Sequence, residues 1–62
     1  MVLKMEFRNL KVGNKYVVGG NTYMKIHWVL RSPNFAFNCV DINSGELFTT
    51  DELEVCEMSN NV

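Results

Sequence analysis

Apolar and polar side chains alternate over residues 22–31. A period of two is typical of a β-strand with one buried face, so we expect a long strand here. Its buried face would carry Met24, Ile26, Trp28 and Leu30. Its exposed face would carry Tyr23, Lys25, His27, Val29 and Arg31. Ser32-Pro33-Asn34 ends the strand, because proline lacks a backbone donor and restricts the residue before it.

Turn residues divide the rest of the chain into short segments. Gly19-Gly20 predicts a tight hairpin after a strand over about residues 15–18, since glycine readily adopts positive φ. After Pro33 we expect a third strand over about residues 35–42. The stretch INSGE then predicts a hairpin with Gly45 in the left-handed conformation, followed by a return strand over residues 46–49.

The stretch TTDELE predicts a short 3-10 turn, because Thr49 and Glu52 have capping-box spacing. A last strand should follow over about residues 54–58, and residues 59–62 should form a flexible tail. Helical periodicity is weak throughout, so we expect one all-β domain over residues 1–58. Its class would be a five-stranded SH3-like small barrel with one 3-10 turn before the last strand. The alternative is an OB-like or other open barrel, which usually needs more residues.

Four stretches, LKVGNKYVV, NTYMKI, NCVDINSGELF and DELEV, together resemble a family of small bacteriophage proteins. The family pattern is a Leu-x-x-Gly-x-x-Phe entry, a Tyr-x-Lys-Ile strand, an Asn-Ala-Val-x-Leu-x-x-Gly-Glu-Leu hairpin and an acidic turn. The similarity covers most of residues 7–57 and implies a phage origin and a small barrel. The chain departs from the pattern at Cys39, where the family has Ala, and in a longer, more aromatic link between the second and third strands.

Composition indicates a small globular domain with a thin stability margin. The chain has 62 residues, of which 47% are hydrophobic and 21% charged, and domains of this size often need a metal, a disulfide or a partner subunit. Cys39, Cys56 and His27 fall short of a four-ligand zinc site, so we expect no metal and no cofactor. No signal sequence or apolar run long enough to span a bilayer appears. We therefore expect a soluble protein of the host cytoplasm with reduced thiols.

Charge is divided along the chain. All six basic residues and one acid precede position 40, and the other six acids follow it. Such a division can attract an anionic partner or a second copy of the chain. The simpler interpretation, which we favour, is that the first and last strands lie side by side and their charges pair.

Nothing in the sequence favours catalysis. The carboxylates are expected to be solvated, and Cys39 is more simply a buried thiol than a nucleophile activated by His27. Gly19-Gly20 lacks the helix and Lys-Ser/Thr of a phosphate loop. We therefore expect a protein that is not an enzyme.

Phe35 and Phe37 are the residues most suggestive of a partner. If Val40 and Ile42 face the core, both phenylalanines face outward and form an apolar patch with Val29 that a monomer should not leave exposed. Alternatively, a bulge near Asn38 resets the register and buries both. The sequence leaves the two possibilities open.

The preferred function is a phage-encoded inhibitor that binds a host enzyme or defence protein through Trp28, Val29, Phe35 and Phe37. A second hypothesis is an oligomeric sponge that holds a small anionic ligand, such as a cyclic nucleotide, with Tyr23, Lys25, His27, Arg31 and Asn38. A nucleic-acid-binding barrel would use a similar basic row, but the pI of about 5.6 argues against it. A structural virion component is a further possibility.

Overall fold

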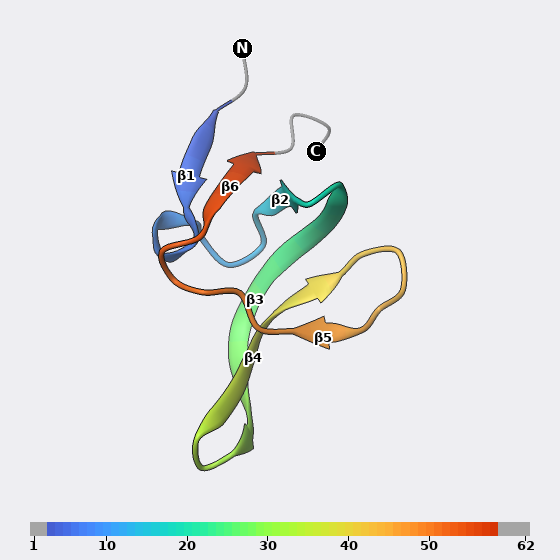
Figure 1. Cartoon of the computed structure of the whole chain (residues 1–62). Helices are drawn as coiled ribbons and strands as arrows, with labels where there is room; N and C mark the ends of the chain where they lie inside the picture. The colour runs from blue at the N-terminus through green and yellow to red at the C-terminus, as the bar shows by residue number, and fades with distance from the viewer. Residues whose placement is uncertain (1–2, 59–62) are drawn as a thin grey trace.

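The computed structural model describes residues 3–58, which form one antiparallel sheet of six strands in the order β1-β6-β2-β3-β4-β5 (Figure 1). The strands are β1 (Lys4–Glu6), β2 (Lys15–Val18), β3 (Asn21–Ser32), β4 (Phe35–Asp41), β5 (Leu47–Phe48) and β6 (Val55–Met58). The all-β prediction is confirmed, whereas five strands was wrong. The predicted tail at residues 59–62 lies outside the described residues.

The additional strand is β1, which has three residues and, among the strands of residues 3–58, pairs with β6 alone. Lys4 lies opposite Glu57 in this pairing, so the basic start of the chain does lie beside its acidic end. Among residues 3–58, however, the one ion pair joins Arg8 to Glu6, with Nε and Oε1 2.9 Å apart. The first and last strands therefore lie side by side as expected, but no ion pair joins them within residues 3–58.

Two of the predicted turns form at the expected glycines. Gly19 and Gly20 have φ of 59° and 82° and make the two-residue connection between Val18 and Asn21. Gly45 has φ of 79°, and its N–H donates to the Asp41 carbonyl at 2.7 Å. These two turns set the pairing of β2 with β3 and of β4 with β5.

The 3-10 helix is not where it was predicted. It is η1 (Phe7–Asn9), directly after β1. Before β6 the chain makes a simple turn, in which the Glu54 N–H donates to the Asp51 carbonyl at 3.0 Å. The Asp51 side chain accepts from the Leu53 N–H at 2.8 Å. This local bond replaces the capping box expected from Thr49 and Glu52.

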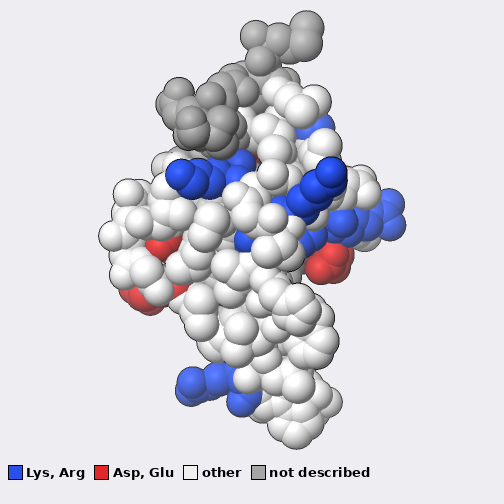
Figure 2. All heavy atoms as spheres, turned by 180° about the vertical axis from the view of Figure 1, so that it is seen from behind, with Lys and Arg blue, Asp and Glu red and all other residues white. Residues whose placement is uncertain are grey.

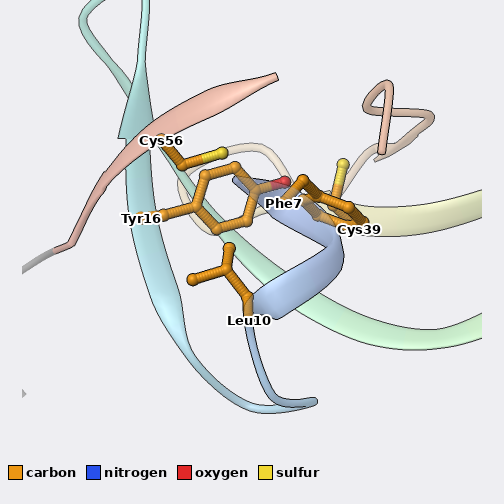
Figure 3. Packing of buried hydrophobic residues seen from close by; sticks show 5 residues of the cluster. All are labelled: Phe7, Leu10, Tyr16, Cys39 and Cys56. Atoms are coloured by element: carbon orange, nitrogen blue, oxygen red, sulfur yellow. The ribbon is translucent and has the colours of Figure 1, made fainter. Parts of the chain in front are cut away.

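The core is small and centred on Tyr16. The most deeply buried side chains are Phe7, Leu10, Tyr16, Cys39 and Cys56, and Figure 3 shows the Tyr16 ring between Cys56 and Leu10. Phe7 meets Tyr16 edge-on with ring centroids 5.6 Å apart, a favourable aromatic geometry. The core therefore joins η1 to β2, β4 and β6.

The face of β3 that points to this core is the opposite of the predicted one. Tyr23 stacks on Tyr16 with centroids 5.7 Å apart, and Lys25 is paired in register with the buried Cys39. Trp28 and Leu30 are 55% and 61% exposed. Their predicted burial is wrong, because β3 extends past the core before reaching them.

Burial changes the acidity of two core groups. It is the main cause of a raised pKa for the Tyr16 hydroxyl. It also raises the pKa of the Cys56 thiol, with a further contribution from the nearby Glu54 carboxylate. Both groups therefore keep their protons in the folded protein at pH values where they would lose them in the unfolded chain.

This difference predicts a loss of stability at alkaline pH. Below about pH 7.5 both groups are protonated in either state. Above its ordinary pKa, each group loses its proton in the unfolded chain but keeps it in the folded protein. The free energy of unfolding should then fall by about 1.4 kcal/mol per pH unit for each group. Denaturant titrations under reducing conditions between pH 7 and 11 measure this slope.

Tyr16→Phe isolates the tyrosine contribution. The substitution should lower the free energy of unfolding at pH 7 by about 1 kcal/mol, because the hydrogen bond of the Tyr16 hydroxyl is lost. Above pH 10 the free energy of unfolding should fall less steeply, by about 1.4 kcal/mol per pH unit, because one titrating group is missing. Equal alkaline slopes in the two proteins would contradict the assignment to Tyr16.

Candidate functional site: an apolar hairpin arm and the groove at its base

Residues 26–37 form a two-stranded arm that extends beyond the rest of the sheet (Figure 1). β2 pairs with β3 only as far as Met24, and β5 pairs with β4 only at Cys39 and Val40. Within the described part of the chain, β3 and β4 are therefore paired only with each other in the arm. The arm contributes to the elongated shape of the molecule, whose principal extents are 40 × 24 × 19 Å.

A register shift marks the base of the arm. Lys25 pairs with Cys39 and the next pair is Val29 with Phe37, so residues 26–28 lie opposite Asn38 alone. One consequence is that the adjacent His27 and Trp28 rings stack, with centroids 5.8 Å apart and planes 19° apart. In a regular strand these neighbours would point to opposite faces, so the irregularity creates a continuous aromatic surface.

Most of the arm's apolar surface is exposed. Trp28, Val29, Leu30 and Phe35 are between 46% and 61% exposed. Phe37 is half-buried and meets Phe35 edge-on at 5.2 Å. Phe35 is exposed, as the first alternative predicted, but Phe37 is not. A bulge is present, as the second alternative predicted, but it lies in β3 opposite Asn38 and does not bury Phe35.

A groove of about 760 Å³ lies between the arm and the connection from β5 to β6, and its lining extends from Lys25 at the arm's base to Asn34 in the turn at the arm's end. Its apolar lining includes Phe7, Trp28 and Phe35, and its other wall carries Asp51 and Glu52. The sequence analysis did not assign Asp51 and Glu52 to a site. Nothing in the spacing of these acidic residues along the chain indicated that they would lie beside the arm.

The wall is fixed by hydrogen bonds between Asn38 and Thr50. The Asn38 side-chain amide donates to the Thr50 carbonyl and accepts from the Thr50 N–H, both at 2.8 Å. Thr50 Oγ1 also lies 3.1 Å from the Tyr16 hydroxyl and 3.2 Å from Cys39 Sγ. The side chain of Thr49 adds a bond to the Ala36 carbonyl. The connection to β6 is thereby held along β4.

Lys25 is also occupied within the fold. Its ammonium donates to the carbonyls of Phe7 and Leu10 at 3.0 and 2.8 Å, and it lies 4.5 Å from the centroid of the Phe7 ring. These contacts fasten η1 to β3. Lys25 therefore closes the end of η1 and is not part of an outward basic row.

The sequence-predicted residues separate into two groups. The arm brings together the predicted partner-binding residues Trp28, Val29, Phe35 and Phe37, and adds Leu30, which was assigned to the buried face. The predicted ligand-binding residues are dispersed: Tyr23, Lys25 and Asn38 contact the fold, whereas His27 and Arg31 are exposed on the arm.

Other kinds of site find little support in residues 3–58. No group of three or more His, Cys, Asp or Glu side chains there could hold a metal ion. Within the same residues no helix is long and apolar enough to cross a membrane. Comparison with known proteins finds no match to a protein-family model, a curated protein sequence or a solved structure. The arm and its groove are therefore the candidate functional site.

The Asn38 contacts predict how the groove wall responds to substitution. Asn38→Ala removes both bonds and leaves the Thr50 backbone groups without these partners, which should cost about 1–3 kcal/mol of unfolding free energy. Amide hydrogen exchange at Thr50 should accelerate as well. Asn34→Ala, in the exposed turn at the arm's end, is the matched control and should cost less than about 0.5 kcal/mol. Unchanged exchange at Thr50 would show that Asn38 does not hold this wall.

Proposed function

We propose that this chain is a non-enzymatic, phage-encoded binding protein that docks its arm on a host enzyme or defence protein and blocks it. The observation that carries the proposal is the exposed apolar surface of residues 28–30 and 35, on an arm that projects beyond the rest of the sheet (Figure 1). A two-stranded ribbon is at best marginally stable in water by itself. A partner that covers it would remove this apolar surface from water.

The composition of the arm suits protein recognition. Binding energy at protein interfaces is concentrated in buried aromatic and arginine anchors, and the arm offers Trp28, Phe35 and Arg31. The arm is narrow and projects from the sheet, so it can enter a cleft and cover an active site without chemistry of its own. In Figure 2 much of the arm is free of charged side chains.

We also propose that the fold is of the SH3-like type. Strands β2 to β5 follow one another as antiparallel neighbours, and β6 returns beside β2 after a short turn. Those features are typical of SH3-like domains, with β1 as an addition at one edge. The arm then corresponds to an elongated central hairpin on a common small scaffold.

A protein partner is better supported than a small anion or a nucleic acid. The side chains of Lys25 and Asn38 already bond to protein groups, and Tyr23 packs against the core. Of the five residues of the expected binding row, His27 and Arg31 remain as exposed groups. The arm's exposed large hydrophobic side chains are Trp28, Val29, Leu30 and Phe35, and aromatic side chains are common anchors at protein interfaces.

Trp28→Ala tests the proposal. Native mass spectrometry of the protein isolated from lysate of its bacterial host would identify the bound protein, and titration of the purified partner would give the Kd. If Trp28 is an anchor of about 2 kcal/mol, the Kd should rise about 30-fold, with little change in the unfolding free energy.

Val55→Ala is the matched control, because Val55 is also 55% exposed but lies on β6, away from the arm. It should leave the Kd unchanged. Equal effects of the two substitutions, or none from Trp28→Ala, would reject the arm as the binding surface.

A further inference from the structure

The arm and its groove are complementary in charge. Within residues 26–37 the charged side chain is Arg31, accompanied by the titratable His27, and there is no acid. The groove wall opposite the arm's base carries Asp51 and Glu52, both exposed. The basic and acidic features lie at different levels along the molecule, so a single chain presents both halves of a possible contact.

The arm also has strand edges without neighbouring strands. Lys25 still exchanges backbone hydrogen bonds with Gly13 and Asn14. Beyond Lys25 no strand pairs with the outer side of β3, and before Cys39 none pairs with the outer side of β4, within residues 3–58. On β4, the side chain of Thr49 occupies the Ala36 carbonyl. Unpaired edges of this kind readily accept a further strand, and β3 is the less obstructed of the two.

We propose that two copies of this chain pair through their arms, which lie side by side and antiparallel about a two-fold axis. From Ile26 to Ser32 an arm reaches about 20 Å at the usual rise per residue. In the antiparallel arrangement the end of each arm comes level with the base of the other. The exposed Trp28 and Leu30 side chains of the two copies then lie beside one another on one face of the joined arms, and Arg31 of each copy comes level with Asp51 and Glu52 of its partner.

A second copy satisfies each feature of the site at once. The arm of the second copy has an apolar surface, carries Arg31 with no acid among residues 26–37, and supplies a strand for the unpaired edge of β3. Two-fold pairing repeats each contact, as is usual in symmetric dimers. The pairing uses the surface of the proposed function, so a host target would compete with the second copy. Pairing and target binding are nevertheless measured separately.

Sedimentation equilibrium of the purified protein, with native mass spectrometry, tests the pairing. We expect a dimer whose dissociation constant rises with salt, because the Arg31 contacts are screened. Arg31→Glu and Glu52→Arg should each raise the dissociation constant about tenfold or more. The double variant restores opposite charges and should return it to within about threefold of the original value.

Lys11→Glu is the matched control, since it makes the same change of charge at an exposed lysine outside the arm; it should leave the dimer intact. Circular dichroism establishes that each variant is folded. A monomer at every accessible concentration would overturn the proposal, as would a dimer unaffected by either single substitution or not rescued by the double. A monomer that still binds a host protein through Trp28 would leave the proposed function standing.

Discussion

Thr50 joins parts of the chain that local sequence would not bring together. Its backbone is held by the Asn38 amide, and its hydroxyl lies beside Tyr16 and Cys39. The connection from β5 to β6 has to cross the sheet without a strand partner of its own, and an asparagine side chain supplies the donor and acceptor that a neighbouring strand would otherwise provide. With this crossing fixed, β6 reaches β2, the core closes over Tyr16, and the acidic wall stands opposite the arm.

The local features of the fold were predictable because local chemistry determines them. Glycine pairs and alternating residues located the hairpins and the two long strands to within a residue or two. The face of β3 was not predictable from its own residues. Lys25 was expected in water, but its ammonium binds the carbonyls at the end of η1, and these acceptors exist only because Phe7 and Leu10 fold back over the core. A short β1 likewise depends on β6 for its pairing.

The candidate site was predictable in composition but not in shape. The aromatic stretch around Trp28 and Phe35 indicated a partner surface, and both side chains are exposed. That they lie on a projecting arm follows from the lengths of β2 and β5, which end before β3 and β4 do. A bulge near Asn38 was one of the two alternatives that the sequence left open, but the sequence did not indicate that the extra residues would lie in β3. Tertiary pairing thus decided which apolar residues became core and which remained outside.

The projecting arm separates what keeps this protein folded from what it presents to other molecules. The deeply buried side chains all lie outside residues 26–37, so substitutions along the outer arm change the surface while sparing most of the packing that holds the domain together. A domain with a thin stability margin tolerates few damaging changes, and placing the exposed apolar surface on an appendage eases that restriction. For the proposed binding role, this division means that substitutions on the arm can change what the protein binds without first requiring a new core.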